Sequence, residues 1–371
     1  MHGKVIRVAQ VIGPAVNGGT EAFVMNYYRK IDHSKIEFDF LVENESRIIN
    51  QEQISKFGKG KVIIIPSYKR PMKYVSSLTK IFQDEQYDIV HSNMNALSFF
   101  TLKAAKKAGI VKRIAHSHST SNKGEFIRNL IKLCLKPLSL KYPTYLCACS
   151  KSAGIWLFGQ KKWLRGDITL IPNAIDLEQF KFNISARKRV REEYGINDST
   201  FVLGTVGRLV TQKNPLFTVD VFYEYLKRNP NSILLFVGEG PLQKKIQKHA
   251  IKYGILDKII FAGSHHHTEY YYSAMDSFIF PSLYEGLGIS LVEAQASGLI
   301  CIGSTAIPSE TMVISSTKYL ALKCSAKEWA LNIPIRDYGR KQQTSLFIKN
   351  HYCIQNEAMK LVDMYENMMK A

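Results

Sequence analysis

Two glutamates in the segment from residue 280 to residue 298 (FPSLYEGLGISLVEAQASG) are spaced so that they could contact one extended ligand. Glu285 follows a predicted strand in a loop, and Glu293 lies on the helix that comes next. Gly286 and Gly288 allow the backbone to approach an anion closely at a helix N-terminus. The amides expected there are those of Leu287, Gly288 and Ile289. The pattern predicts a cradle for a polyphosphate and a sugar, although an ordinary loop with solvated glutamates would have a similar sequence.

Two cations follow the first predicted strand of the second half of the chain, in the segment GTVGRLVTQKN at residues 204–214. Arg208 could hold a diphosphate with its bidentate guanidinium, and Lys213 could add a point charge. No aspartate cluster suited to Mg²⁺ accompanies them in the sequence. We therefore expect the side chains to neutralise a leaving diphosphate, while two exposed cations on a basic protein are the simpler alternative.

A glycine turn after the first predicted strand could present backbone amides to a phosphate. The segment from Asn17 to Glu21 (NGGTE) places Gly18 and Gly19 between a strand and a helix. Together with Gly13, these glycines do not form the GxGxxG spacing of a dinucleotide site. The turn therefore predicts a phosphate contact from the first half of the chain and disfavours a Rossmann oxidoreductase.

Histidines follow two further predicted strands of the first half. His116 and His118 come after a short strand in RIAHSHST, and His91 ends the strand before it. Hydrogen bonding to a sugar hydroxyl, metal binding and a structural role are all compatible with this pattern. A second group, from His265 to His267, is interpreted as a loop near the nucleotide, because three consecutive histidines cannot all face one ion on regular structure.

Strand-like and helical segments alternate along the whole chain, which predicts parallel sheets covered by helices on both faces. In the first half, strands are expected at residues 5–11, 38–42, 62–65, 89–91, 114–115 and 145–148. In the second half they are expected at residues 201–206, 233–237, 259–261, 277–280 and 299–302. We predict two Rossmann-like doubly wound α/β domains, 1–180 and 181–351, that face each other across a cleft, followed by an amphipathic helix at 352–371.

The composition of the 371-residue chain, with 46% hydrophobic and 22% charged residues, is that of a globular protein. Six cysteines without a CxxC pair favour a reducing cytoplasm. The N-terminus lacks the pattern of a signal peptide, and no apolar run approaches the roughly 20 residues that span a bilayer. We therefore expect a cytoplasmic protein.

The positive charge is concentrated in the first half of the chain. The formal charge is +19, with 27 basic and 14 acidic residues before residue 181 and 23 basic and 17 acidic residues after it. Such an excess indicates a polyanionic partner, which could be nucleic acid, anionic lipid or a phosphorylated substrate.

Taken together and in this order, the segments resemble glycosyltransferase family 4, the retaining enzymes of the GT-B fold, and in particular those of bacterial exopolysaccharide and capsule biosynthesis. The resemblance covers essentially the whole chain. The motifs that carry it are NGGTE, RIAHSHST, IPNAID at 171–176, VGRL with QKN, GEGPL at 238–242, FAG at 261–263 and the PSLYEGLGISLVEA block. The segment STAIPS at residues 304–309 departs from the glycine-rich loop of many members.

The resemblance implies a donor site built from the second half of the chain. Glu293 would bind the donor ribose, and Arg208 and Lys213 would hold the diphosphate. The transferred sugar would be gripped by Glu285 and by the backbone of residues 286–289, which are Gly286, Leu287, Gly288 and Ile289.

The first half of the chain would complete the site in such an enzyme. Gly18 and Gly19 would contact the phosphates, and His118 matches the family's histidine near the donor sugar and acceptor better than His116 does. The final helix would pack back on the N-terminal domain. The implied catalytic residues are His118, Glu285, Arg208 and Lys213.

The implied reaction is retaining transfer of a hexose or N-acetylhexosamine from a nucleotide-diphosphate sugar, with UDP as the expected nucleotide. The leaving phosphate would take the acceptor proton, and neither a cofactor nor a divalent metal is expected. Charge stabilisation by Arg208 and Lys213 would be a large contribution to catalysis. A GT-B nucleotide-sugar 2-epimerase is an alternative with the same architecture, and the two-glutamate block and the basic first half argue against it.

The expected acceptor is a growing polysaccharide linked to polyprenyl diphosphate. Residues 123–141 place Arg128, Lys132 and Lys136 at four-residue spacing beside apolar side chains. A basic amphipathic helix of this kind gains roughly 1 kcal/mol per cation near anionic lipid, which predicts peripheral association with the inner face of the cell membrane. A core-facing helix with a solvated basic side is the alternative, and no nucleic-acid reader motif is present in the sequence.

Overall fold

The computed structural model describes residues 4–15, 19–118, 135–336 and 339–370, which fold as two compact units. Unit 1 contains residues 1–174 and 351–371, and unit 2 contains residues 175–350. The chain therefore leaves unit 1 once and returns to it for its last helix. The sequence places the division between residues 180 and 181.

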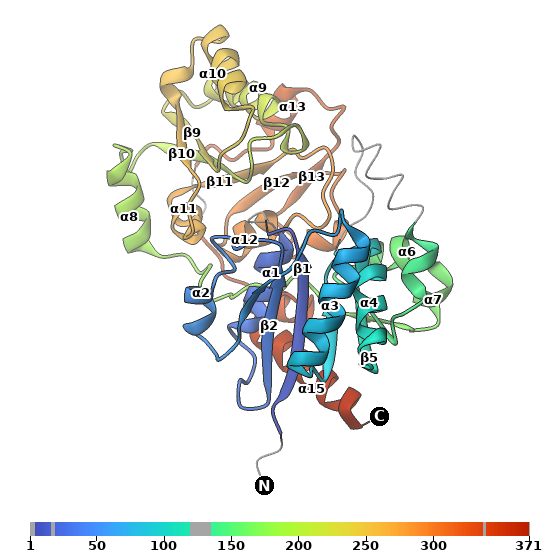
Figure 1. Ribbon diagram of the computed structural model, residues 1–371. Helices are drawn as coiled ribbons and strands as arrows, with labels where there is room; N and C mark the ends of the chain where they lie inside the picture. The colour runs from blue at the N-terminus through green and yellow to red at the C-terminus, as the bar shows by residue number, and fades with distance from the viewer. Residues whose placement is uncertain (1–3, 16–18, 119–134, 337–338, 371) are drawn as a thin grey trace. The chain divides into compact units, whose positions relative to one another are not determined.

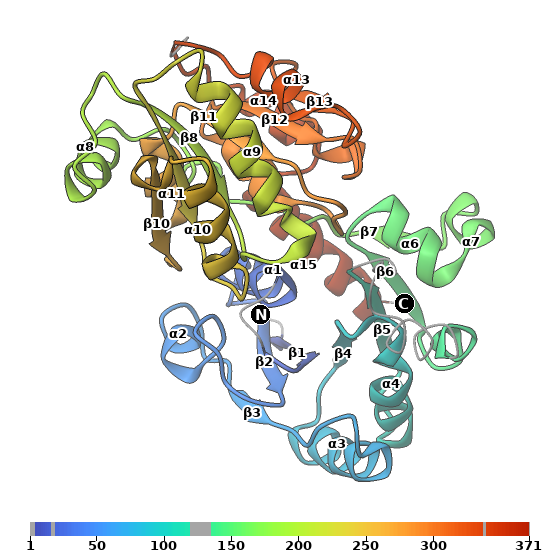
Figure 2. The ribbon, with the colours of Figure 1, turned by 90° about the horizontal axis from the view of Figure 1, so that it is seen from above.

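Unit 1 is built on a sheet of seven parallel strands in the order β3-β2-β1-β4-β5-β6-β7, which can be followed in Figure 2. The strands are β1 (Ile6–Gly13), β2 (Ile36–Val42), β3 (Val62–Ile64), β4 (Ile89–Ser92), β5 (Lys112–Ser117), β6 (Tyr145–Ala148) and β7 (Ile168–Leu170). The six expected strands are present. Strand β7 was missed because it has three residues, two of them exposed at the edge of the sheet, so it shows no apolar run.

Helices cover both faces of this sheet. They are α1 (Gly19–Tyr28), α2 (Gln51–Ser55), α3 (Pro71–Glu85), α4 (Ser98–Lys107), α6 (Lys151–Phe158), α7 (Gln160–Leu164) and α15 (Ile354–Lys370). One core joins the sheet to α1, α2 and α15, and the other joins it to α3, α4 and α6. The last helix buries Leu361 and Tyr365 in the first of these cores, so it is an integral part of unit 1.

Unit 2 repeats the architecture with six parallel strands in the order β10-β9-β8-β11-β12-β13. The strands are β8 (Phe201–Val206), β9 (Ser232–Val237), β10 (Ile259–Gly263), β11 (Ser277–Phe280), β12 (Ile300–Ser304) and β13 (Lys318–Leu320). The first five were expected. Strand β13 was missed because it is another three-residue edge strand without a fully buried residue.

The helices of unit 2 are α8 (Ile184–Glu193), α9 (Pro215–Leu226), α10 (Gln243–Lys252), α11 (Thr268–Ala274), α12 (Ile289–Ala296), α13 (Ala326–Leu331) and α14 (Thr344–Lys349). Figure 1 shows α9, α10 and α13 on one side of the strands and α11 and α12 on the other. Pro215 begins α9, where its missing N–H costs nothing, and a capping box of Ser325 and Glu328 begins α13.

Both sheets have the doubly wound strand order in which the direction of winding reverses beside the first strand. The reversal lies between β1 and β4 in unit 1 and between β8 and β11 in unit 2. Sheets of this kind bind ligands beyond the carboxyl ends of the strands at the point of reversal. The loops after these four strands are therefore the first places to look for a site.

In the part of the chain that the structure describes, no helix combines the length and the apolar character needed to cross a bilayer.

Candidate functional site

The carboxyl ends of β8 and β11 bring two of the predicted segments together. The loop after β8 carries Arg208 and Lys213, and the loop after β11 carries Glu285. A hydrogen bond from the amide of Leu283 to the carbonyl of Gln212, at 2.8 Å, joins the loops directly. Lys213 and Glu285, 72 positions apart in sequence, thus share the point of strand reversal in unit 2.

Lys213 and Glu285 form an ion pair at the centre of this arrangement. Lys213 Nζ lies 2.7 Å from Glu285 Oε1 and 4.5 Å from the centre of the Phe280 ring. The Glu285 side chain is only 7% exposed, while that of Lys213 is 22% exposed. The ammonium can therefore turn toward a ligand while the carboxylate stays anchored in the protein.

Gln212 holds the second oxygen of this carboxylate and was not predicted as a site residue. Its Nε2 donates to Glu285 Oε2 and to the carbonyl of Tyr284, both at 3.1 Å. The only sequence signal for Gln212 is the QKN motif, and the motif by itself indicates no role for the glutamine. The structure gives Gln212 the role of fixing where Glu285 points.

Arg208 is exposed beside this ion pair, and it lines a small cavity that Lys213 also lines. Its loop is held by the glycines of the GEGPL motif. A Cβ on Gly238 would lie 2.2 Å from the carbonyl oxygen of Gly207, and one on Gly240 would lie 2.5 Å from that of Leu209. These close backbone contacts explain why the motif needs glycine, and they place Arg208 at the end of β8.

The N-terminus of α12 provides the backbone part of the predicted cradle. Gly288, with φ +91°, is the residue before the helix, and no side chain caps it. Among the described residues, none accepts a hydrogen bond from the amides of Leu287, Gly288 and Ile289. Free amides at the start of a helix attract anions, and Gly286 leaves their approach open.

Glu293 lies one turn further along α12 and is partly buried. The hydroxyl of Tyr272 donates to Glu293 Oε2 at 2.8 Å. The pKa of Glu293 is raised to about 7, mainly because the side chain is buried and also because Glu269 is near, while Tyr272 and Lys213 act in the opposite direction. A carboxyl group whose pKa is shifted to near neutral pH in this way is typical of functional sites.

The predicted histidines gather in unit 1, at the carboxyl ends of β4 and β5. His116 lies inside β5 rather than after it, because this strand extends to Ser117, and His118 is the first residue beyond. His91 Nε2 lies 2.9 Å from His116 Nδ1, and the rings of His116 and His118 stack at 4.0 Å. Burial lowers the pKa of His91 and of His118 to about 3 and that of His116 well below its usual value, so all three are neutral.

The histidines make no metal site within the described residues, where no group of three or more candidate ligands occurs. His265 and His267, in the loop before α11, also bond within the protein. His265 Nε2 lies 2.7 Å from both the Ala262 carbonyl and the Tyr271 hydroxyl, and His267 Nδ1 lies 2.9 Å from Glu269.

Two of the predicted contacts fall partly outside the described residues. Gly18 lies outside them, and Gly19 begins α1. Of the basic segment at 123–141, Arg128 and Lys132 lie outside the described part of the chain. Lys136 is described, and its Nζ lies 5.6 Å from the centre of the Trp156 ring.

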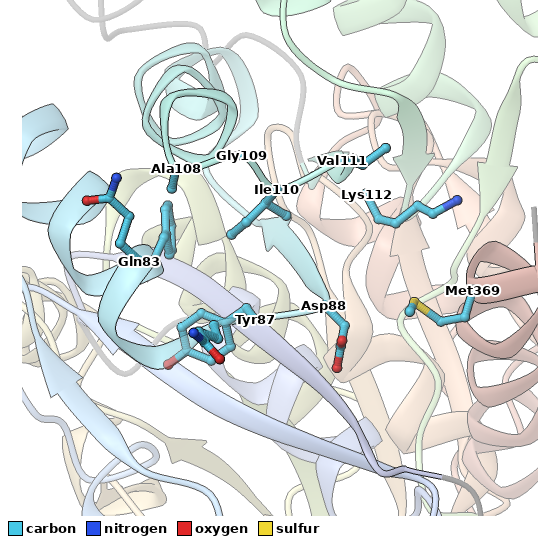
Figure 3. A pocket seen from close by; sticks show the side chains of 11 residues that line it. Gln83, Tyr87, Asp88, Ala108, Gly109, Ile110, Val111, Lys112 and Met369 are labelled. Carbon is cyan, nitrogen blue, oxygen red and sulfur yellow. The ribbon is translucent and has the colours of Figure 1, made fainter.

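A groove in unit 1, shown in Figure 3, lies at the opposite ends of the strands. Asp88 stands immediately before β4, Lys112 begins β5, and Met369 of α15 completes the lining. The Asp88 carboxylate accepts from the amide of Arg7 at 2.9 Å and pairs with Lys4 at 3.2 Å. Doubly wound sheets do their chemistry at the carboxyl ends, so this groove has no place in the candidate site.

Two doubly wound α/β units in one chain, the second with two cations, free amides and a fixed carboxylate at its strand reversal, define the GT-B fold. Residues 17–179 match the family model described as Glycosyltransferase Family 4, and residues 186–334 match the one described as Glycosyl transferases group 1. The chain belongs to glycosyltransferase family 4 and is a glycosyltransferase of the polysaccharide-biosynthesis type.

Individual relatives agree with this assignment. The putative glycosyltransferase EpsF of Bacillus subtilis is 35% identical over 312 residues, which cover 83% of this chain and 81% of that protein. An Escherichia coli enzyme named UDP-Gal:alpha-D-GlcNAc-diphosphoundecaprenol alpha-1,3-galactosyltransferase is 30% identical over 244 residues, 63% of this chain and 62% of that protein. The crystal structure of Anabaena HepE in complex with UDP and glucose has a TM-score of 0.74 at 15% identity and covers 99% of this chain and all of that chain, which shows a shared fold.

Proposed function

We propose that this protein transfers a hexose or N-acetylhexosamine from a UDP-sugar, with retention of anomeric configuration, to a saccharide linked to polyprenyl diphosphate. The observation that carries the proposal is the corner of unit 2 where Lys213 and Glu285 meet at 2.7 Å beside Arg208 and the amides of α12. Cations, free amides and a fixed carboxylate suit a diphosphate joined to a sugar.

Each group in this corner has a distinct task in the proposed reaction. Arg208 and Lys213 bind the diphosphate and stabilise the charge that develops on it as the glycosidic bond breaks. Glu285, held by Gln212, accepts hydrogen bonds from hydroxyls of the transferred sugar. Glu293 accepts from the ribose hydroxyls, and its elevated pKa favours the ionised form only above about pH 7.

The corner also supports a reaction that needs no metal and no covalent intermediate. Arg208 and Lys213 provide the positive charge that Mg²⁺ would otherwise bring to a diphosphate. Glu285 is committed to Lys213 and Gln212 rather than poised as a nucleophile. We therefore propose that UDP departs, that the acceptor hydroxyl attacks from the same face, and that the leaving phosphate takes its proton.

The proposed acceptor carries a lipid diphosphate. The Escherichia coli relative is named for an acceptor linked to diphosphoundecaprenol, and the excess of 13 positive charges before residue 181 suits an anionic membrane surface. In this proposal His118 faces the sugar and the acceptor, while residues 123–141 hold the protein at the inner face of the membrane.

The test is a donor screen with the purified protein. Thermal shift and slow hydrolysis are measured with UDP-, GDP-, ADP- and dTDP-sugars, each with and without EDTA, and the best donor is then combined with undecaprenyl-diphosphate-linked saccharide. We expect one UDP-sugar to stabilise the protein and to be transferred with an α linkage from an α donor, unaffected by EDTA.

Each part of the proposal has its own contrary result. A different preferred nucleotide would refute the UDP assignment, inversion of the product linkage would refute retention, and loss of activity with EDTA would refute metal independence. Transfer to water-soluble saccharides alone would refute the lipid-linked acceptor.

A further inference from the structure

A two-armed chain of buried hydrogen bonds connects the three histidines of unit 1 to the last helix of the chain. Tyr365 of α15 lies with its hydroxyl 2.7 Å from His91 Nδ1 and 3.1 Å from Gln10 Nε2. One arm continues from His91 to His116 at 2.9 Å. The other arm runs from Gln10 through Asn93 to His118 Nε2, with both further contacts at 2.9 Å. We call these six residues the Tyr365 circuit.

The circuit is shielded from water. Gln10, His91, Asn93, His116 and Tyr365 are each at most 2% exposed. Burial also raises the pKa of Tyr365 well above its usual value, so its hydroxyl keeps its proton. Each group in such an environment must act either as a donor or as an acceptor toward its partner, because bulk solvent does not reach these side chains to compensate a mismatch.

The arm through His91 fixes the tautomers of two histidines. Gln10 Nε2 donates to the Tyr365 oxygen, so the one hydroxyl proton is directed to His91 Nδ1. A neutral imidazole has a single N–H, which His91 must therefore carry on Nε2 and donate to His116 Nδ1. By the same rule His116 carries its proton on Nε2.

The arm through Asn93 fixes the third histidine. Asn93 Nδ2 donates to Gln10 Oε1 and also lies 3.5 Å from the carbonyl oxygen of His91. Turning this amide over would point its oxygen at that carbonyl, so Asn93 Oδ1 faces His118 and accepts from Nε2–H. His118 Nδ1 is then an unprotonated acceptor.

The two ends of the circuit have no partner. Among the described residues, neither His116 Nε2 nor His118 Nδ1 has one, although both atoms are buried. A buried polar atom without a partner costs free energy that a ligand can recover by bonding to it. On His118, the histidine that the proposed function places near the sugar, the open position is an acceptor and suits a hydroxyl donor.

We propose that Tyr365 is a positioning residue that holds His91, His116 and His118 in the Nε2–H tautomer, so that His118 presents Nδ1 as an acceptor to a sugar hydroxyl. The inference rests on the proposed function for the identity of the ligand. The tautomers themselves follow from the circuit alone. A residue of the last helix thereby sets the chemistry of the sheet's carboxyl edge.

The test measures tautomers and catalysis separately. Side-chain ¹⁵N–¹H NMR of ¹⁵N-histidine-labelled protein near pH 5.5 distinguishes neutral Nε2–H from Nδ1–H imidazoles, and His91, His116 and His118 are assigned by single substitution. We expect pure Nε2–H signals for these three in the wild type and mixed tautomers in Tyr365→Phe. Tyr74→Phe is the matched control, because it removes an equally buried hydroxyl, bonded to Thr101 at 3.0 Å, in the other core of unit 1.

Sugar transfer is measured on the same proteins. Tyr365→Phe is expected to lower kcat about five- to tenfold, the equivalent of one net hydrogen bond, with unchanged binding of UDP and an unchanged control. Pure Nε2–H signals in Tyr365→Phe, or mixed tautomers with unchanged kcat, would overturn the inference. A wild type inactive on every donor would refute the proposed function, and the NMR spectra would still decide the circuit.

A second variant covers the case in which Tyr365→Phe does not fold. Asn93→Leu removes only the hydrogen bonds of the arm that reaches His118. It is expected to give mixed tautomers at His118 while His91 and His116 stay Nε2–H. Mixed tautomers at all three histidines, or at none, would contradict the two-armed circuit.

Discussion

Single residues in the corner of unit 2 differ in how firmly the protein holds them. Glu285 has two partners and is almost buried, whereas Arg208 is exposed and has no carboxylate partner in the part of the chain that the structure describes. Lys213 stands between these extremes, since it pairs with Glu285 but retains a solvent-exposed side. In the proposed function, this arrangement keeps the carboxylate assigned to the sugar fixed and leaves the cations adjustable to a diphosphate.

Removal of the Lys213 charge should impair catalysis more than stability. We expect Lys213→Ala to lower kcat/KM by about 100-fold, because a cation aimed at a leaving group contributes most in the transition state. Lys227→Ala is a matched control, since Lys227 also pairs with a glutamate, at 2.6 Å, and lies over an aromatic ring, at 4.4 Å. Steady-state kinetics with the best donor measure both variants, and equal losses would show that the Lys213 charge has no special role.

The pKa of Glu293 predicts how donor binding depends on pH. Because this pKa is about 7, the carboxylate that would accept from the ribose is mostly lost between pH 8 and pH 6. The KM for donor should therefore rise about tenfold over this range in the wild type, while Glu293→Gln should show a flat profile. A parallel rise in the variant would assign the effect to another group.

The same pKa predicts that the stability of the folded protein depends on pH in the opposite direction to donor binding. The folded pKa of Glu293 is raised above its ordinary value of 4.5, so its contribution to stability is present at acidic pH and is lost as the pH rises through 7. Relative to wild type, Glu293→Gln should be more stable at pH 8 than at pH 5. Denaturant unfolding at the two pH values checks this sign.

At the scale of elements, the start of α12 depends on a residue with left-handed backbone geometry. Gly288 has φ +91°, and a Cβ there would lie 3.2 Å from the Phe280 ring, next to Lys213. Gly288→Ala should therefore move the amides to which the proposed function assigns the phosphate. We expect at least a tenfold loss of kcat/KM with roughly 1–2 kcal/mol of destabilisation.

Gly254→Ala separates strain from function. Gly254 has φ +67°, and nothing lies within 4 Å of the position that a Cβ would take. Alanine at this position should therefore cause backbone strain similar to that in Gly288→Ala, but no neighbouring residue needs to move. Kinetics and denaturant unfolding on both variants test the prediction. If Gly254→Ala lost as much activity as Gly288→Ala, general destabilisation would explain both.

At the scale of the molecule, the last helix links the end of the chain to the unit in which it began. Leu361 is buried in the core that α15 shares with β1 and β2. Leu361→Ala should lower the stability of unit 1 by about 2–5 kcal/mol, because it leaves a cavity in a packed core. The stabilisation of unit 2 by UDP should persist, since unit 2 has its own core.

Met359 on the same helix is 60% exposed and is the control for this substitution. Met359→Ala should change stability by no more than about 0.5 kcal/mol. Calorimetric unfolding with and without UDP measures both variants. A loss of the UDP effect in Leu361→Ala would show that the two units unfold as one.

Much of this organisation was predictable from the sequence because local patterns carried it. Local sequence shows the long apolar strands such as β1 and β8, the glycine before α12 and the spacing of Glu285 and Glu293. The order of the motifs indicated the family. Edge strands β7 and β13 escaped prediction because each has only three residues, and at least one of them is exposed, so there is no periodicity to detect.

The sequence by itself thus determined the fold class, the family and the residue types in the corner of unit 2, since these depend on periodicity, turn chemistry and motif order. Only the tertiary structure decided which groups pair. The contact of Lys213 with Glu285 and the link from Tyr365 to His91 join residues 72 and 274 positions apart, and no local pattern encodes such distances. The same contacts decided the protonation states. Burial and hydrogen-bond partners, rather than residue type, set the pKa of Glu293 and determine which ring nitrogen of each histidine carries the proton.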